Sequence, residues 1–229
     1  MTAHPLDRPV WNALTTGWAE RSLGDGRARQ LSPQFGPFAA AADTTPDSQR
    51  ALGALAPGPD GLWVVEPDEW PAPDGMVVDH HALCHQMIAD AVPPFDGGFE
   101  VYELTEADAA EMYDLAIATR PGPFASQTHR LSQFIGVKHD GRLVAMAGER
   151  MKTTEFAEVS GVCTYPEFRG RGYAAGLMRI VANRIVARGE KPFLHTYADN
   201  AGAIALYKTL GFRFRRELML TVLRPLTRV

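Results

Sequence analysis

The sequence predicts an α/β protein built on a mixed sheet, and three observations support this prediction. Residues 158–163 are rich in β-branched and small side chains and lead through a glycine-containing turn into a helix that starts near Ala174. Another strand, at residues 192–197, follows that helix. A helical crossover allows the two strands to be parallel, whereas the turn signal Asp140-Gly141 joins antiparallel strands, so the sheet is expected to be mixed.

The turn after residues 158–163 has the features of a phosphate-binding loop. Gly170 and Gly172 allow a ligand to approach the backbone, and Arg169 and Arg171 add positive charge. The first N–H groups of the following helix lack intrahelical partners, so the loop is expected to hold a phosphate or pyrophosphate. No lysine follows Gly172 as a P-loop requires, and the motif lies too late in the chain for a dinucleotide-binding first strand.

Three spaced patterns in this region resemble the GCN5-related N-acetyltransferase (GNAT) superfamily. In chain order they are Val162-x-Thr164-x-Pro166, Arg169-x-x-Gly172-x-Ala174 and Asn200-x-x-Ala203-x-x-x-Tyr207-x-x-x-Gly211-Phe212. The ending Gly211-Phe212-Arg213-Phe214-Arg215 looks closest to the FR47-like subgroup. The resemblance covers about residues 98–225 and implies the GNAT fold and an N-acetyltransferase that moves an acetyl group directly from acetyl-CoA to an amine.

The resemblance also implies which residues hold acetyl-CoA. The loop and helix start would bind the pyrophosphate, and the splayed strands on either side of the helix would receive the pantetheine arm as an added strand. The implied cofactor-binding residues are Val162, Cys163, Thr164, Arg169, Gly170, Arg171, Gly172, Tyr173, Ala174, Asn200, Ala203 and Tyr207. No metal ligand belongs to this set.

Direct acetyl transfer requires a base for the amine, stabilisation of the thioester oxygen and an acid for the leaving thiolate. The resemblance places the acid at Tyr207, whose phenol stays protonated near neutral pH. Glu158 and Glu149 are the candidate bases, and Glu158 is alternatively a surface residue or an ion-pair partner of Arg150. His195 is a further candidate base or a hydrogen-bonded core histidine.

Two regions are expected, meeting near residues 96–98. Residues 1–95 show short strands and helices broken by prolines and no glycine-rich loop, so they are interpreted as an N-terminal α/β region, a degenerate GNAT-like half. Residues 96–229 are assigned to the acetyltransferase domain. It opens with an alternating strand at residues 99–104 and a helix capped by Thr105, and the stiff loop at residues 119–124 is expected to form a pocket wall.

The composition is that of a globular protein without a strong attraction for polyanions. The chain has 229 residues, 45% of them hydrophobic, and a net charge of −4, so no partnership with nucleic acid or anionic membrane is expected. Two cysteines, Cys84 and Cys163, form no disulfide framework, and the N-terminus shows no signal-peptide pattern, so a cytoplasmic location is expected. His80, His81 and His85 beside Cys84 lack the further ligands of a metal site.

Three classes of function remain compatible with these patterns: an acetyl-CoA-dependent N-acetyltransferase, a catalytically silent acyl-CoA-binding regulatory module, and a nucleotide-binding protein of another fold. Tyr207 beside an intact loop favours the first over the second, and the missing P-loop lysine argues against the third. The expected partner is a small-molecule or peptide amine. The sequence fixes neither that acceptor nor the oligomeric state, for which a homodimer is one option.

Overall fold

The computed structural model describes residues 4–226. Its helices are η1 (Pro5–Asp7), α1 (Pro9–Thr15), η2 (Ala19–Arg21), α2 (Pro46–Gly53), η3 (Glu106–Asp108), α3 (Ala109–Thr119), η4 (Thr128–Arg130), η5 (Pro166–Phe168), α4 (Tyr173–Ala187) and α5 (Ala201–Thr209). Its strands are β1 (Ser22–Gly24), β2 (Ala28–Leu31), β3 (Ala39–Ala41), β4 (Leu62–Glu66), β5 (Met76–Ile88), β6 (Tyr102–Glu103), β7 (Ile135–His139), β8 (Arg142–Lys152), β9 (Phe156–Thr164), β10 (Lys191–Tyr197) and β11 (Arg213–Pro225).

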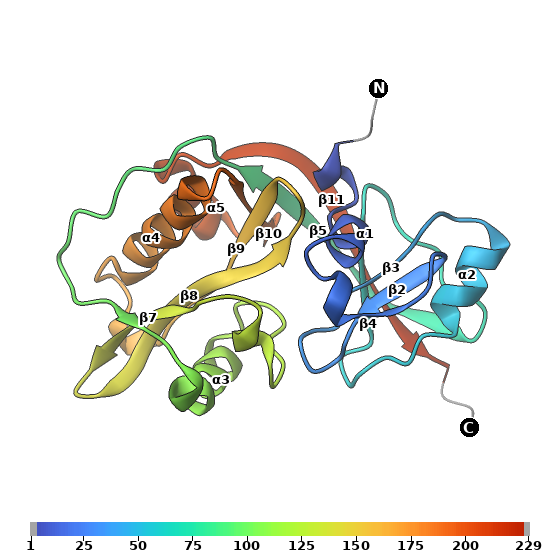
Figure 1. Ribbon diagram of the computed structural model, residues 1–229, viewed down its shortest axis with the longest axis horizontal. Helices are drawn as coiled ribbons and strands as arrows, with labels where there is room; N and C mark the ends of the chain where they lie inside the picture. The colour runs from blue at the N-terminus through green and yellow to red at the C-terminus, as the bar shows by residue number, and fades with distance from the viewer. Residues whose placement is uncertain (1–3, 227–229) are drawn as a thin grey trace.

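Most strands belong to one eight-stranded sheet with the order β4-β11-β5-β10-β9-β8-β7-β6. β9 and β10 are parallel, and the other neighbours in this sheet are antiparallel. The predicted mixed sheet is therefore confirmed, as is the parallel pair joined by the α4 crossover. A separate three-stranded sheet, β1-β2-β3, lies near α2 in the half of the molecule that also carries β4 (Figure 1).

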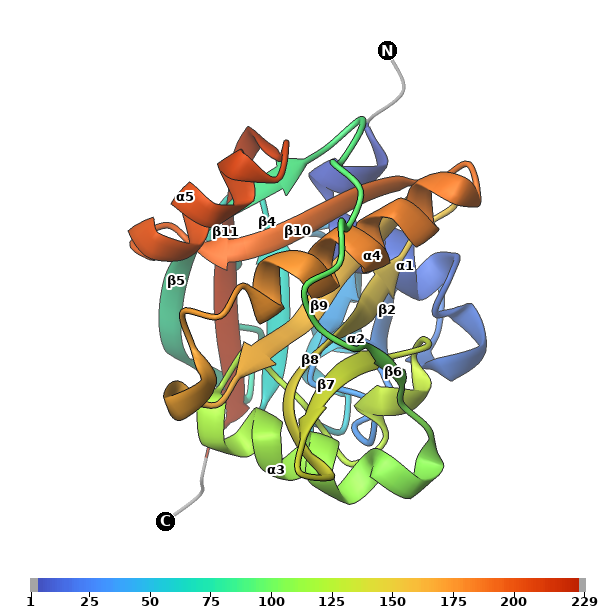
Figure 2. The same cartoon turned by 90° about the vertical axis from the view of Figure 1, so that its left-hand side faces the viewer.

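The parallel pair stays together over only part of its length. Lys191, Pro192 and Phe193 of β10 pair with residues 156–158 of β9, and farther along β10 pairs only with β5, as far as Tyr197. A gap therefore opens between β9 and β10 beyond Glu158. Figure 2 shows α4 crossing the sheet beside this pair of strands.

Helices cover both faces of the large sheet. The apolar stripe of α4 packs on one face together with the end of α5; its members are Leu177, Met178, Val181, Ala182 and Ile185. On the opposite face α1 packs over β4, β5, β10 and β11, and α3 packs over β8 and β9. The gap between β9 and β10 is thus open to both faces of the sheet.

The N-terminal region completes the same sheet. β5 lies between β10 and β11, and its register with β11 extends from Met76 opposite Pro225 to Ile88 opposite Arg213. In Figure 1, β5 and β11 curve from the half with α4 and α5 to the half with α2. The proposed regions 1–95 and 96–229 therefore share one sheet, and the GNAT-like origin of the first region stays a proposal.

Candidate active site

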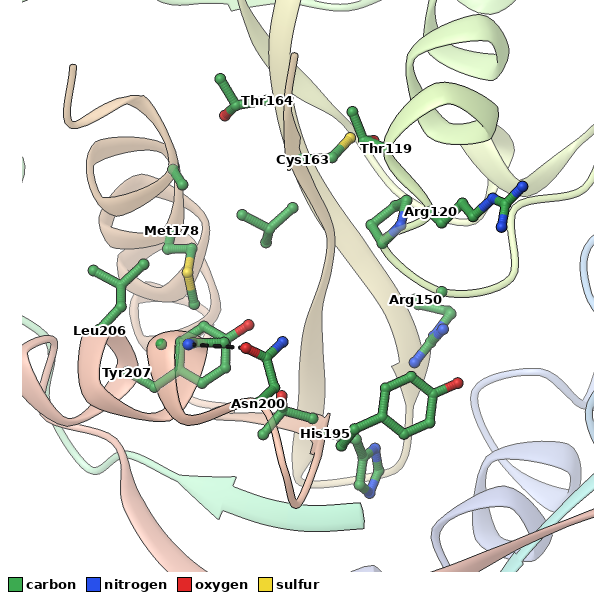
Figure 3. Close-up of a pocket in the computed structure, with 18 of the residues that line it drawn as sticks. Thr119, Arg120, Arg150, Cys163, Thr164, Met178, His195, Asn200, Leu206 and Tyr207 are labelled. Carbon is green, nitrogen blue, oxygen red and sulfur yellow. Dashed lines mark hydrogen bonds between the residues drawn. The ribbon is translucent and has the colours of Figure 1, made fainter. Parts of the chain in front are cut away.

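A cavity of about 810 Å³ occupies the gap between β9 and β10. Every residue that the sequence assigned to cofactor binding lines it, from Val162 on β9 through the glycine loop to Tyr207 on α5. Figure 3 shows Asn200, Leu206 and Tyr207 on one side of this cavity and Thr119, Arg120 and Arg150 on the other. The sequence motifs are therefore brought together around one space.

The loop before α4 offers a row of free backbone donors. Gly170 and Gly172 have φ values of 76° and 78°, in the left-handed region, and space is open where a Cβ would stand. Within residues 4–226, none of the N–H groups from Gly170 to Ala175 meets an acceptor. This row at the start of a 15-residue helix is a cradle for an anion and fits a pyrophosphate.

A bulge in β9 redirects the backbone at the gap. Cys163 pairs with Met146 and Ser160 with Gly148, so the two residues between them on β9 face only one on β8. Gly161 in this bulge has a φ of 62°, and a Cβ there would lie 2.7 Å from Cε1 of Phe134. Glycine is therefore required where β9 turns its edge toward the cavity.

Tyr207 and Asn200 come from α5. The Asn200 side chain caps the helix, because its Oδ1 accepts from the Ala203 N–H at 3.2 Å. Tyr207 is half-buried in the cavity wall, and burial raises the pKa of its phenol, so the hydroxyl keeps its proton and is able to donate. The cavity wall therefore holds one protonated phenol that can donate a hydrogen bond or a proton to a bound group.

Glu158 does not line the cavity, contrary to the role of base expected for it. Its carboxylate is fully buried, accepts from Nε and Nη2 of Arg150 at 2.9 Å each, and accepts from Nδ1 of His195 at 2.8 Å. Burial opposes its ionisation, but Arg150 and His195 outweigh burial and lower its pKa to about 2. So acidic and so enclosed a carboxylate is a poor base; the alternative of an Arg150 partner is what the structure shows.

Glu149 also lies away from the cavity lining. Its carboxylate contacts Nη2 of Arg188 at 2.7 Å, and its side chain is 15% exposed. Arg188 directly follows α4 on one face of the sheet, whereas Arg150 lies over Phe38 on the opposite face. Glu149 is therefore directed away from the side on which Arg150 meets the cavity. The expectation of a base at Glu149 is not supported by this position.

His195 lines the cavity, but both of its ring nitrogens are engaged. The Gln86 amide nitrogen donates to Leu6 O at 3.0 Å, and its Oε1 accepts from Arg215 at 2.8 Å, which fixes the amide orientation. That nitrogen lies 3.0 Å from Nε2 of His195, which must therefore accept, so Nδ1 carries the proton toward Glu158. His195 therefore links β10 to β5 and β9 through its two ring nitrogens.

Cys163 is a core residue rather than a nucleophile. Its side chain is 6% exposed, and burial raises the pKa of its thiol to about 12. Within residues 4–226 no group of His, Cys, Asp and Glu side chains is arranged to hold a metal ion. In the same described part of the chain, no helix combines the length and apolarity needed to cross a membrane.

Part of the cavity wall was not found by sequence reasoning. Phe38, Trp63, Val65 and Cys84 from the N-terminal region line it, as does Arg150. These residues belong to no sequence motif. The apolar ones cannot be distinguished from core residues by their sequence alone. The predicted wall at residues 119–124 does contribute, through Thr119 to Pro123.

The chain is similar to known acetyltransferases in sequence and in structure. Residues 134–220 match the family model described as FR47-like protein. The N-alpha-acetyltransferase RimI of Mycobacterium tuberculosis (strain ATCC 25618 / H37Rv) is 32% identical over 138 residues, which cover 56% of this chain and 83% of that relative.

Solved structures extend the similarity to nearly the whole chain. A GNAT-family protein from Novosphingobium aromaticivorans DSM 12444 is 52% identical, with a TM-score of 0.91 over 98% of this chain and 100% of its own. A GCN5-related N-acetyltransferase from Kribbella flavida, 19% identical, has a TM-score of 0.63 over 94% of this chain and 95% of its own, which shows a shared fold.

Proposed function

The chain belongs to the GCN5-related N-acetyltransferase superfamily, and from this premise we propose that it is of the FR47-like kind and transfers the acetyl group of acetyl-CoA directly to an amine acceptor. One observation carries the proposal: the row of free N–H groups from Gly170 to Ala175 and the protonated Tyr207 line the same cavity. The first feature fits the pyrophosphate of CoA, and the second suits its leaving sulfur.

Different residues of the cavity lining are proposed to bind different parts of CoA. The N–H groups of Gly170 to Ala174 and the side chains of Arg169 and Arg171 would hold the pyrophosphate. Val162, Cys163 and Thr164 on β9, which no longer pair with β10, would receive the pantetheine arm. Asn200 and Ala203 at the start of α5 line the same end of the cavity.

Tyr207 is proposed as the general acid. When bound, acetyl-CoA supplies a thioester whose sulfur leaves as a thiolate, and a phenol that keeps its proton can donate to it. The β9 bulge at Gly161 is proposed to turn backbone donors toward the thioester oxygen, where negative charge develops.

The amine is proposed to enter in its neutral form, without a side-chain base. Glu158 is enclosed by Arg150 and His195, Glu149 contacts Arg188, and the His195 lone pair accepts from Gln86. Among the described residues that line the cavity, none is Asp or Glu. The initial proton release is therefore assigned to solvent.

Thiol release with purified protein tests the function. We expect CoA thiol to appear when acetyl-CoA and a panel of amines are supplied together, and acetyl-CoA to bind in calorimetry where NAD and ATP do not. Binding without thiol release for any amine would favour the alternative of a silent acyl-CoA-binding regulatory module. A cytoplasmic setting, in which Cys84 and Cys163 stay reduced, and a homodimer are lesser parts of the proposal.

A further inference from the structure

Part of the cavity is lined by large apolar side chains. Phe38, Trp63 and Val65 from the N-terminal region and Leu220 from β11 line it. The Trp63 ring meets the Phe38 ring edge-on at 6.2 Å between centroids, and Phe38 is only 3% exposed. This wall, which we call the aromatic wall, stands on the face of the sheet opposite α4.

Arg150 lies beside the aromatic wall with part of its guanidinium free. Its Nε and Nη2 bind Glu158, and its Cζ lies 4.8 Å from the centroid of the Phe38 ring. Trp18 donates to the backbone oxygen of Arg150 at 2.9 Å, which fixes the strand at this point. Within residues 4–226, Nη1 has no hydrogen-bond acceptor. Its side chain is 12% exposed and lines the cavity, so Nη1 offers unused donors in a partly desolvated place.

The position of Arg150 is set by the geometry of the gap. Glu158, its partner, is the last residue of β9 that pairs with β10, so the pair stands where the two strands separate. An anionic group on Nη1 would therefore lie next to the opening that leads to Tyr207 and the cofactor loop. The aromatic wall lies on the same side of that opening.

The charges that line the cavity exclude one class of acceptor and favour another. The charged lining residues within the described chain are arginines: Arg120, Arg150, Arg169 and Arg171. Polyamines and aminoglycosides, which carry several positive charges, would meet no carboxylate there. A carboxylate would find the guanidinium fork of Arg150. Nearby positive charge also favours the neutral form of an amine, which replaces part of the work of a base.

We propose, resting on the proposed acetyltransferase function, that the acceptor is a free α-amino acid with a large apolar or aromatic side chain. Its carboxylate binds Nη1 of Arg150, its side chain packs on the aromatic wall, and its α-amine faces the gap between β9 and β10. In the transfer the amine nitrogen forms a bond to the acetyl carbon, the carbon–sulfur bond breaks, and the sulfur takes a proton from Tyr207. The amine proton leaves to solvent, and solvent returns a proton to Tyr207.

A matched set of acceptors tests the proposal on the wild-type protein. Thiol release is measured at fixed pH with L-phenylalanine, L-phenylalanine amide, 2-phenylethylamine, glycine, spermidine and a short peptide with N-terminal phenylalanine. We expect kcat/KM for phenylalanine to be about 10- to 100-fold higher than for its amide or phenylethylamine, because only phenylalanine has a carboxylate that can accept a charged hydrogen bond from Arg150. The amide lacks the negative charge that keeps the amine protonated, so a larger share of its amine is neutral and reactive. A preference for phenylalanine must therefore overcome this advantage of the amide.

Two outcomes separate this inference from the function on which it rests. Turnover of spermidine, the peptide, the amide or phenylethylamine that equals or exceeds turnover of phenylalanine would overturn the amino-acid acceptor and leave the acetyltransferase proposal in place. Thiol release with none of the amines, together with no acetyl-CoA binding, would overturn both.

Arg150→Lys is the variant that locates the carboxylate. Lysine keeps the positive charge beside buried Glu158 but lacks the guanidinium fork, so the preference for phenylalanine over its amide should fall toward unity while acetyl-CoA affinity stays unchanged. Arg184→Lys is the matched control, because Arg184 binds Glu103 on the surface, away from the cavity lining. A preference retained in Arg150→Lys would refute the assignment, and the wild-type series stands even if this variant folds poorly.

Discussion

Replacing Gly172 by valine, with Gly189→Val as the comparison, distinguishes a role of Gly172 in phosphate binding from its role in allowing a left-handed backbone conformation. Gly172 precedes α4 with φ at 78°, and Gly189 follows the same helix with φ also at 78°. At both positions a Cβ would enter open space. An L side chain in the left-handed region costs about 1–3 kcal/mol of folding free energy, so Gly172→Val and Gly189→Val should lose similar stability.

Only the Gly172 variant should lose cofactor affinity. Its side chain would occupy the approach to the free N–H groups of residues 170–175, whereas Gly189 stands away from the cavity lining. Losing one hydrogen bond between the backbone and a charged phosphate is worth about 1.5–3 kcal/mol, which raises the Kd for acetyl-CoA roughly 10- to 150-fold. Calorimetry at fixed salt measures the Kd, and thermal unfolding measures the cost shared by both variants. Equal Kd values in the two folded variants would refute the phosphate cradle.

Three further predictions concern proton-carrying groups. Tyr207→Phe should lower turnover at saturating acetyl-CoA without changing its Kd, and equal turnover from pH 6 to 9 would reduce Tyr207 to a packing residue. The Glu158 pKa lies below that of an unfolded carboxyl, so its contribution to stability should be complete above about pH 5 and be lost as the pH falls toward 2, as denaturant unfolding at several pH values would show. Glu158→Gln should cost about 3–5 kcal/mol of unfolding free energy at pH 7, because it leaves Arg150 buried without its counter-charge, and a variant as stable as the wild type would contradict the ion-pair role.

The sequence was sufficient to predict those parts of the fold and the site that depend on residues close together in the chain. The strand, glycine loop and helix at residues 158–187 are local, and the parallel pairing of β9 with β10 follows from the crossover that joins them. The predicted cofactor residues are close in sequence to one another or lie on α5, whose cap at Asn200 is also a local signal. Their common cavity could therefore be anticipated.

The sequence could not show that Glu158 is unsuited to be a base, because its acidity depends on residues from three other strands. The sequence places Glu158 before the loop, but its acidity comes from Arg150 on β8 and His195 on β10, and His195 is fixed by Gln86 on β5. Local periodicity does not reveal which residues of distant strands stand opposite each other. The residues of the aromatic wall could not be predicted for the same reason.

The place of β5 in the sheet has a consequence for how the protein is made. β5 is synthesised before β10 and β11, yet it lies between them, and Gln86 meets His195 across a separation of 109 residues. Contacts of such long range close late, because the entropy of closing the loop is lost before the contact forms. During translation both edges of β5 stay unpaired by their final neighbours until β10 is made, and the edge that pairs with β11 stays so until β11 has emerged from the ribosome. Chaperone dependence and aggregation should therefore concentrate in this interval.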